Sequence, residues 1–317
     1  MSEFGLIQRY FTRPTPRAVL GVGDDAALLQ VSSGMELAVS TDMLVSGTHF
    51  FADADPYLLG HKALAVNISD MAAMGAQPRW ATLALSLPSV DATWLEKFSA
   101  GFFALADEYQ VELIGGDTTQ GPLNLSITIM GEVPHGAALR RDGAKLGDEI
   151  WVSGQLGNAA LALAHMQGKI KLDDVNFNAA VKALHRPEPR VALGIALRGK
   201  AHSAIDISDG LLADLGHILQ RSGVAAEINF AALPLSTTLQ QLMSQALAQR
   251  CALAGGDDYE LCFTAPVAQH DTIIALAHER TLPLTCIGHI VSGSGCIVRN
   301  ADGSVMTTKE IGYEHFA

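Results

Sequence analysis

Cysteine is scarce in this sequence, and the few cysteines form no paired motif. The 317 residues include 4 cysteines, which are Cys251, Cys262, Cys286 and Cys296. Because no two of them form a CxxC pair, the chain has no paired-cysteine metal or redox motif. We expect buried, reduced thiols and a cytoplasmic protein.

Positive charge and long apolar runs are also in short supply. The chain has 21 Lys and Arg against 33 Asp and Glu, a formal net charge of −12. This charge argues against nucleic acid or an anionic membrane as a partner, because both require basic patches. A nucleotide ligand is compatible with this negative charge, because bound divalent cations reverse the local sign of charge. No uncharged apolar run reaches membrane-spanning length, and residues 1–10 lack the apolar core of a signal peptide.

The common catalytic motifs are missing as well. The sequence has no GxGxxG, HExxH or GxSxG, so dehydrogenase, zinc protease and α/β-hydrolase functions lack support. The nearest P-loop match is 194–201, but Ala201 replaces the hydroxyl that would bind Mg²⁺. The segment also has a helical pattern and does not follow a strand, so we interpret it as a chance match.

The composition is that of a folded protein with two domains. Hydrophobic residues make up 49% and charged residues 17%, as in globular proteins, and the length suits two cores. The segment 140–148 has the features of a connecting loop, and we place the domain boundary there, giving domains 1–148 and 149–317. Both halves carry a Ser-Asp motif and later a Gly-Gly-Asp motif, in the same order. This repetition predicts two related α/β halves.

The most informative stretch is 63–76, which is almost wholly apolar but contains Asp70. A buried carboxylate is costly unless a partner compensates its charge. The residues 56–66 are expected to form a helix that leads into this stretch. An alternative is that Asp70 caps a second helix that begins at Met71.

Three further motifs present oxygen-bearing side chains. Glycines precede paired acids at 21–25, and Ser-Thr-Asp at 40–42 is expected at the end of a strand. Two glycines, Asp and two Thr at 115–119 predict a phosphate and metal loop after a strand. A simple hairpin turn at 21–25 and a Ser/Thr turn at 40–42 are the alternatives.

Taken together, the aspartates of these motifs are predicted to lie at glycine turns or strand ends and not on helix surfaces. They are Asp25, Asp42, Asp70, Asp117, Asp206, Asp209 and Asp257. Gathered carboxylates repel one another unless divalent cations neutralise them, and Mg²⁺ is typically held by carboxylates, water and substrate phosphates. The pattern therefore predicts phosphoryl transfer, in which catalysis is mostly positioning and charge neutralisation.

The motifs, taken in order, resemble the thiamine-monophosphate kinase family over nearly the whole chain. The resembling segments are Gly-Val-Gly-Asp-Asp at 21–25, Ser-Thr-Asp at 40–42, Val-Asn-Ile-Ser-Asp-Met-Ala-Ala-Met-Gly at 66–75, Gly-Gly-Asp-Thr-Thr at 115–119, Ile-Asp-Ile-Ser-Asp-Gly at 205–210 and Gly-Gly-Asp-Asp-Tyr-Glu-Leu-Cys at 255–262. The resemblance implies ATP-dependent phosphorylation of thiamine monophosphate to thiamine diphosphate, directly and without a phosphoenzyme. It also implies an α/β (α+β), two-domain fold like that of aminoimidazole ribonucleotide synthetase, with N-terminal sheets that pair into a barrel across a homodimer.

The resemblance assigns site residues position by position. Several Mg²⁺ ions would be held by Asp25, Ser40, Thr41, Asp42, Asp70, Asp117, Asp206 and Asp209. ATP would contact Tyr109, Gly116, Asp117, Arg141 and Ser208, whereas thiamine monophosphate would contact His49, Asp257 and Tyr313. The catalytic residues would be Asp70, Asp117 and Asp209. In the family, the position of Asp257 is often Glu, so its shorter side chain puts this substrate contact in question.

The residues taken singly leave simpler interpretations open. His49 beside aromatic residues is typical of a packed side chain, and the basic loop around Arg141 is equally typical of a solvated linker. Two other functions compete with the kinase: another ATP-using member of the same superfamily, and an acidic metal-binding protein without turnover. Substrate profiling distinguishes the kinase from another ATP-using member, and a test for ATP turnover distinguishes it from a metal-binding protein.

Overall fold

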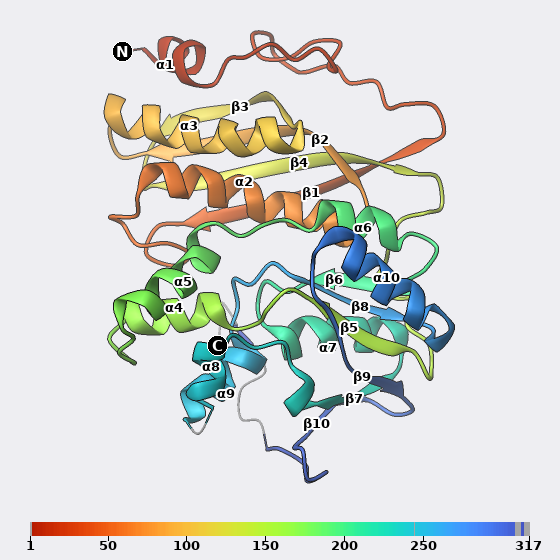
Figure 1. Cartoon of the computed structure of the whole chain (residues 1–317). Coiled ribbons are helices and arrows are strands. Elements are labelled where there is room, and N and C mark those ends of the chain that lie inside the picture. The colour runs from red at the N-terminus through yellow and green to blue at the C-terminus, as the bar shows by residue number, and fades with distance from the viewer. Residues whose placement is uncertain (1, 244, 308–311, 314–317) are drawn as a thin grey trace. The chain divides into compact units, whose positions relative to one another are not determined.

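The computed structural model describes residues 2–243, 245–307 and 312–313. The chain divides into two compact units, of which one combines Met1–Met71 with Ala76–Gly136 and the other combines Ala72–Gly75 with Ala137–Ala317. Both units are mixtures of helices and strands, which confirms the mixed α/β, two-domain class (Figure 1). Among the described residues, no helix has the length and apolar character needed to cross a membrane.

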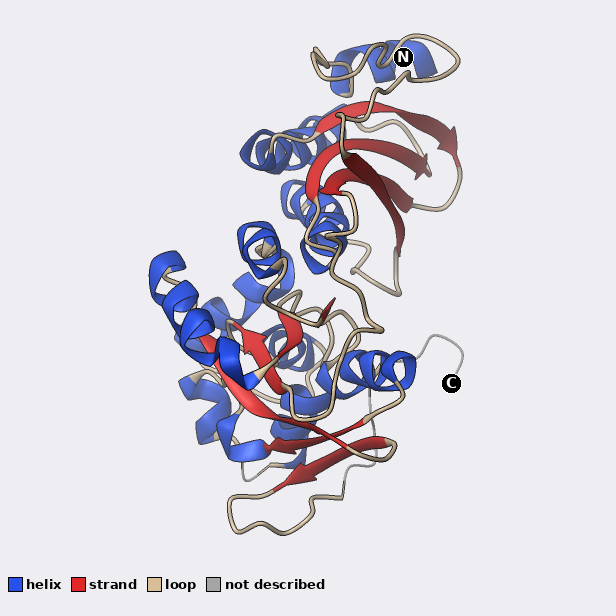
Figure 2. Cartoon of the chain, turned by 90° about the vertical axis from the view of Figure 1, so that its right-hand side faces the viewer, coloured by secondary structure: helices blue, strands red, loops and turns tan. Residues whose placement is uncertain are grey.

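The first unit is built on a four-stranded sheet of order β1-β4-β2-β3. Its elements are α1 (Glu3–Tyr10), β1 (Met35–Val45), α2 (Pro56–Ala73), β2 (Gln77–Leu87), α3 (Ala92–Tyr109), β3 (Glu112–Gln120) and β4 (Asn124–Pro134). Strand β4 pairs antiparallel with β1 and β2, and β3 pairs parallel with β2 across the α3 connection. Helices α2 and α3 cover one face of this sheet (Figures 1 and 2).

Helices α2 and α3 approach each other closely because each supplies a glycine at the crossing. A Cβ atom on Gly60 would lie 2.1 Å from the Phe98 carbonyl oxygen, and one on Gly101 would lie 1.9 Å from that of Tyr57. Only glycine leaves room for these contacts. The close crossing buries Phe98 and Phe102 completely, and these aromatic rings anchor the core of the first unit.

The apolar run at 63–76 forms one helix and not two. Helix α2 continues past the predicted end at Val66 to Ala73, because the segment after Gly60 contains neither glycine nor proline until Gly75. Gly75 has φ +63° and ends the helix, and the Ala76 N–H donates to the Met71 carbonyl at 2.7 Å. Asp70 therefore lies in the C-terminal part of α2, and the alternative that it caps a following helix is wrong.

Strand β1 is an edge strand with one open apolar face. Its alternate residues Leu37, Val39 and Met43 are 40%, 57% and 57% exposed, whereas Leu44 is buried on the helix-covered face. Helix α1 also leaves an apolar side chain exposed. Phe4 is exposed and Leu6 and Tyr10 are buried, because residues four apart share one side of a helix.

The second unit is built on a six-stranded sheet of order β10-β7-β9-β5-β8-β6. Its strands are β5 (Glu149–Ser153), β6 (Ser203–Asp206), β7 (Ala225–Asn229), β8 (Leu261–Ala265), β9 (Leu284–Val291) and β10 (Gly295–Arg299). Its helices are α4 (Asn158–Met166), α5 (Asp174–His185), α6 (Val191–Leu197), α7 (Leu211–Ser222), α8 (Thr237–Gln241), α9 (Ala246–Ala254) and α10 (His270–Arg280), with 3₁₀ turns η1 (Phe230–Ala232) and η2 (Val267–Gln269).

Strand β5 lies inside the second sheet, with β9 and β8 as antiparallel neighbours, and all of its residues are buried. Strands β10 and β7 form the parallel pair of this sheet. The two sheets differ in strand number and order, so the motifs shared by the two halves do not come with a shared topology. The P-loop-like segment 194–201 begins inside α6, as its helical pattern predicted.

Candidate active site

In the first unit, α2 and β1 bring together the polar residues of two predicted motifs. The Ser40 hydroxyl donates to Asp70 Oδ2 at 2.6 Å, and the Asp42 N–H donates to Asn67 Oδ1 at 3.1 Å. The Asn67 amide in turn donates to the Ala63 carbonyl inside α2 at 2.9 Å. Asn67, which is buried, and Asp70, which is half-buried, therefore face the first strand, where their hydrogen bonds offset the cost of burial.

The Ser-Thr-Asp motif lies in the middle of β1 and not at the end of a strand, because β1 continues to Val45. Consecutive strand residues point to opposite faces, so the Thr41 side chain lies on the open face. There its hydroxyl shares a 2.8 Å hydrogen bond with the Thr128 hydroxyl of β4. Ser40 and Asp42 share the helix-covered face with Asp70, and this face gathers the hard oxygen ligands.

The first Gly-Gly-Asp motif lies within β3 and not in a loop. Gly116 pairs with Leu83 of β2 and has φ +144°, and a Cβ atom on it would lie 1.9 Å from the Leu83 carbonyl oxygen. Strand pairing with β2 thus continues through both glycines, which a propensity argument does not foresee. Asp117 follows as an exposed residue of this edge strand.

The remaining predicted residues of the first unit lie at turns and element ends. Asp25 is exposed and follows Asp24, whose carboxylate accepts the Asp25 N–H at 2.9 Å. His49 Nδ1 accepts the Val45 N–H at 3.0 Å, so the ring is tied to the end of β1 with Nε2 left to carry the proton. Tyr109 is the last residue of α3 and is half-buried.

In the second unit, two predicted motifs distant in sequence lie side by side. The Asp257 N–H donates to the Ser208 carbonyl, the Tyr259 N–H to the Ile207 carbonyl and the Ile207 N–H to the Glu260 carbonyl, each at 2.8 Å. Gly256 permits this approach, because a Cβ atom on it would lie 2.4 Å from the Ser208 carbonyl oxygen. We call the segments 206–210 and 255–260 the paired loops.

The loop that carries Ser208 and Asp209 is shaped by Asp214, a residue that the sequence analysis did not single out. Asp214 Oδ2 accepts the N–H groups of Ser208, Asp209 and Gly210 at 3.0, 3.0 and 3.1 Å. Burial raises the pKa of Asp214 to about 7, although the three N–H donors act in the opposite direction. Its place four residues after Gly210 is the sequence signal that could have identified it, because a first-turn acid caps the N-terminus of α7.

The second paired loop contains unusual backbone and a buried acid. Asp257 and Tyr259 have backbone φ angles of +70° and +50°, which residues other than glycine rarely adopt. Between them, Asp258 Oδ2 accepts the Gly157 N–H at 2.8 Å, before the first turn of α4. Burial raises the pKa of Asp258 well above its usual range, and its Oδ1 atom has no hydrogen-bond partner.

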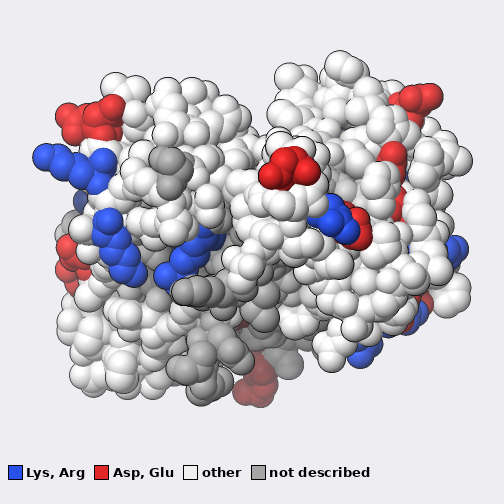
Figure 3. Space-filling view, turned by 90° about the horizontal axis from the view of Figure 1, so that it is seen from below, with Lys and Arg blue, Asp and Glu red and all other residues white. Residues whose placement is uncertain are grey.

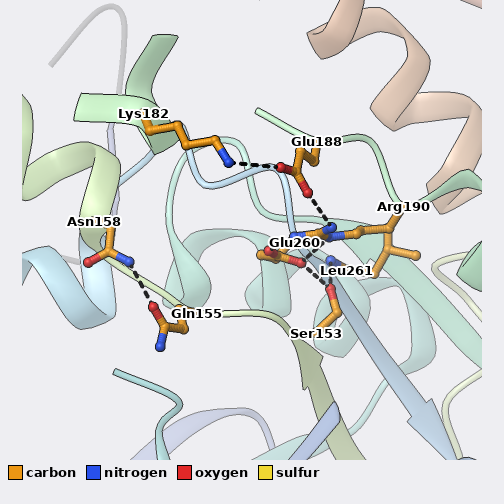
Figure 4. A network of polar contacts seen from close by, with 8 residues as sticks. All are labelled: Ser153, Gln155, Asn158, Lys182, Glu188, Arg190, Glu260 and Leu261. Carbon is orange, nitrogen blue, oxygen red and sulfur yellow. Dashed lines mark hydrogen bonds and ion pairs between the residues drawn. The ribbon is translucent and has the colours of Figure 1, made fainter. Parts of the chain in front are cut away.

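A polar network holds the end of the same loop (Figure 4). Arg190 donates to Glu260 through Nε to Oε2 at 2.7 Å and through Nη2 to Oε1 at 2.5 Å. The Ser153 hydroxyl donates to Glu260 Oε2 at 2.5 Å and accepts the Leu261 N–H at 2.9 Å. Burial lowers the pKa of Arg190, but its bonds and charge contacts with Glu260 and Glu188 raise it to a net value above normal.

Arg141 and Tyr313 are attached to the second unit through their backbones. The Arg141 carbonyl accepts the Ser222 hydroxyl at 3.0 Å, which ties the exposed basic loop to the end of α7. The Tyr313 N–H donates to the Asp209 carbonyl at 3.0 Å, and its side chain is 51% exposed. Tyr313 is therefore tied to the second unit through its backbone, whereas residues 314–317 lie outside the described part of the chain.

The prediction that the aspartates avoid helices and strand interiors is wrong for three of them. Asp70 lies in α2, where buried apolar neighbours continue the helix, and Asp42 and Asp117 lie inside strands, because pairing with β4 and β2 continues β1 and β3 through them. Among the side chains that the structure describes, no group of three His, Cys, Asp or Glu residues is gathered closely enough to hold a metal ion. On the face shown in Figure 3, charged side chains are scattered among uncharged ones.

Comparison with known families matches both units. Residues 23–133 match the family described as AIR synthase related protein, N-terminal domain, and residues 145–299 match the AIR synthase related protein, C-terminal domain. Together the two matches span most of the chain.

Curated relatives and solved structures extend the match to nearly full length. The thiamine-monophosphate kinase of Escherichia coli strain K12 is 48% identical over 322 residues, covering 99% of this chain and 98% of its own. The crystal structure of thiamine-monophosphate kinase from Stenotrophomonas maltophilia K279a has a TM-score of 0.88 and 51% identity, covering 96% of this chain and 98% of that one. The structure of AaThiL complexed with AMPPCP and TMP has a TM-score of 0.78 and 32% identity, and the match covers 90% of this chain and 89% of that one.

Proposed function

This chain belongs to the thiamine-monophosphate kinase family, and we propose that it transfers the terminal phosphoryl group of ATP to thiamine monophosphate. The products are ADP and thiamine diphosphate. The observation that carries the proposal is that this chain and its thiamine-monophosphate kinase relatives cover each other almost completely at close to half identity. The AaThiL complex with AMPPCP and TMP supports a nucleotide and a TMP ligand for this fold.

We assign the site residues by the roles that the resemblance implies. ATP is contacted by Tyr109, Gly116, Asp117, Arg141 and Ser208. Thiamine monophosphate is contacted by His49, Asp257 and Tyr313, and Asp70, Asp117 and Asp209 are the catalytic residues. The backbone hydrogen bond between Asp257 and Ser208 supports this assignment, because these two residues then lie beside each other in one unit.

The donor chemistry of the acidic residues fits Mg²⁺. The proposed ligands are Asp25, Ser40, Asp42, Asp70, Asp117, Asp206 and Asp209. Thr41, which the resemblance also implies, has its hydroxyl on the open face against Thr128, so we do not assign its side chain to the metal. The proposed ligands all offer hard oxygen atoms, and Mg²⁺ usually takes one or two carboxylates per ion, with water and phosphate oxygens completing its shell. Such a set does not require a preformed group of three acids. Bound Mg²⁺ would neutralise charge on the transferring phosphoryl group.

The chain itself contributes positioning and charge. Ser40 holds the Asp70 carboxylate in a defined orientation, and Asp214 holds the three amides of residues 208–210 in one arc. Phosphoryl transfer needs little covalent chemistry from the protein, so such preorganised groups supply most of the rate enhancement. We propose direct transfer between the two substrates, without a phosphoenzyme.

We also propose a homodimer in which the open face of the first sheet meets that of a second copy. The exposed residues Leu37, Val39 and Met43 of β1 form an apolar strip, and such strips mark interaction sites. Replacing Val39 with Lys should convert a dimer into monomers in light scattering, whereas Val175→Lys, at another exposed valine, should not. A wild-type monomer would contradict the proposal. The functional division at residues 148 and 149 and the cytoplasmic location stay predictions.

Steady-state turnover tests the proposed reaction. The protein is given Mg-ATP with thiamine monophosphate or free thiamine, and ADP and thiamine diphosphate are quantified. We expect equal amounts of both products from thiamine monophosphate and no phosphorylation of free thiamine. ATP binding without thiamine diphosphate formation would indicate another ATP-using member of the superfamily. No ATP turnover with any phosphorylated metabolite would indicate a metal-binding protein.

A further inference from the structure

Glu260 connects the core of the second unit to the segment that carries Asp257. Its carboxylate is only 8% exposed and accepts three hydrogen bonds, two from Arg190 and one from Ser153 (Figure 4). Gly154 leaves space for this carboxylate, because a Cβ atom on Gly154 would lie 1.9 Å from Glu260 Oε1. The surroundings are therefore shaped around the Glu260 carboxylate and its guanidinium partner.

The backbone of Glu260 continues this anchoring toward the proposed substrate residue. Its carbonyl accepts the Ile207 N–H at 2.8 Å, and the Tyr259 N–H returns to the Ile207 carbonyl at the same distance. The Asp257 N–H donates to the carbonyl of Ser208, the residue that follows Ile207. The positive φ angles of Asp257 and Tyr259 lie within this short stretch, and such conformations persist only where the surroundings impose them.

We infer that Arg190, Ser153 and Glu260 are positioning residues for the acceptor substrate: together they hold the strained 257–259 segment so that Asp257 meets thiamine monophosphate. This inference rests on the proposed function of Asp257. The network acts on the Asp257 segment from its C-terminal end, whereas Asp214 acts on the 208–210 loop from α7. Each paired loop thus has its own buried carboxylate as an anchor.

The network requires arginine at position 190 because of the geometry of the guanidinium group. Arg190 uses two nitrogen atoms against the two oxygen atoms of Glu260, and lysine keeps the charge but cannot form this fork. Displacing a substrate contact by about 1 Å lowers kcat/KM by up to about 100-fold. A partial loosening of the loop should therefore be visible in substrate binding even where the protein stays folded.

Arg190→Lys and Glu260→Gln test the inference in the full-length protein. We expect the KM for thiamine monophosphate to rise about tenfold or more, with kcat and the KM for ATP changing less than about threefold. Glu188→Gln is the matched control, because Glu188 lies on the outer side of Arg190 at 3.3 Å, is 59% exposed and does not touch Glu260 in the fork. This variant should keep wild-type kinetics.

A double-mutant cycle with Asp257→Ala separates positioning from general stability. If Glu260 acts through Asp257, the loss in thiamine monophosphate affinity caused by Arg190→Lys should largely disappear once Asp257 is absent. Full additivity of the two losses, or wild-type KM values in a folded Arg190→Lys protein, would overturn the inference. Thermal unfolding reports which variants are folded, and Arg190→Lys decides the matter if Glu260→Gln does not fold. A wild-type protein that makes no thiamine diphosphate would instead refute the proposed function.

Discussion

The chain contains the tripeptide Gly-Gly-Asp twice, and the two copies have different structures. At 115–117 it continues strand β3, with Gly116 paired to Leu83 of β2. At 255–257 it forms a loop in which Asp257 itself has φ +70°. In both copies the second glycine lies against a carbonyl oxygen of a neighbouring segment, Leu83 in one and Ser208 in the other. The shared requirement is close approach, and the partner segment decides the backbone path.

The two aspartates also have different surroundings, and removing the charge of each should give the largest effects on the kinetics. We expect Asp117→Asn to lower kcat by about 100-fold or more, because it removes a proposed metal and ATP ligand that acts in the transition state. Asp257→Asn should instead raise the KM for thiamine monophosphate by about tenfold with a smaller change in kcat. Steady-state kinetics with each substrate varied in turn measures both. Identical kinetic defects in the two variants would show that the motifs do not divide these roles.

The two glycines of the first motif should differ strongly in their tolerance of a methyl group. Gly116→Ala would place Cβ 1.9 Å from the Leu83 carbonyl oxygen at φ +144°, and should reduce the free energy of unfolding by about 3 kcal/mol. Gly115→Ala would meet Thr82 Cγ2 at 4.0 Å, an ordinary contact, and should change it by less than about 1 kcal/mol. Denaturant unfolding measures both. Equal stability of the two variants would contradict the observed strand pairing through Gly116.

The second motif continues with a buried acid, Asp258, where the first continues with Thr118. Because burial raises the pKa of Asp258, the folded state binds a proton that the unfolded state releases above about pH 4. The free energy of unfolding should therefore fall as pH rises from about 4 toward the raised pKa, by at most about 1.4 kcal/mol per pH unit for this group.

Asp258→Asn removes this titration at nearly constant volume. Relative to the wild type, the variant should gain stability as pH rises from 5 to 8, in unfolding curves recorded at each pH. Parallel pH profiles of the two proteins would show that Asp258 is ionised in the folded state throughout. This effect is the smallest of the three, because it involves one group with one N–H donor from Gly157.

The sequence predicted elements where the pattern was local and failed where tertiary neighbours decided. Helix α3 begins at a local signal that the sequence contains, because Asp91 caps it by accepting the N–H groups of Thr93 and Trp94. The strand through Gly115 and Gly116 was not foreseen, because pairing with β2 outweighs the low strand propensity of glycine. The length of α2 was underestimated for a related reason, since its apolar burial overrides the interrupting polar residues.

The residues of the site also divide into those indicated by local sequence patterns and those decided by tertiary neighbours. Short motifs and their resemblance to a family predicted roles for Asp70, Ser208 and Asp257, and these roles stay predictions. The residues that hold these motifs in place were missed: Arg190 is 70 positions from Glu260 in the chain, and nothing local indicates that they form an ion pair. Side chains that act on other side chains through space can be identified only once the fold brings them together.

Single-turnover transfer from ATP labelled at the terminal phosphate tests the central claim most directly. The protein, in excess over ATP, is mixed with Mg²⁺ and thiamine monophosphate and quenched at successive times. We predict that the label passes from ATP to thiamine diphosphate at one rate, with none bound to the protein at any time. Label that accumulates on the protein, or that is released as inorganic phosphate without thiamine diphosphate, would contradict direct transfer to this acceptor.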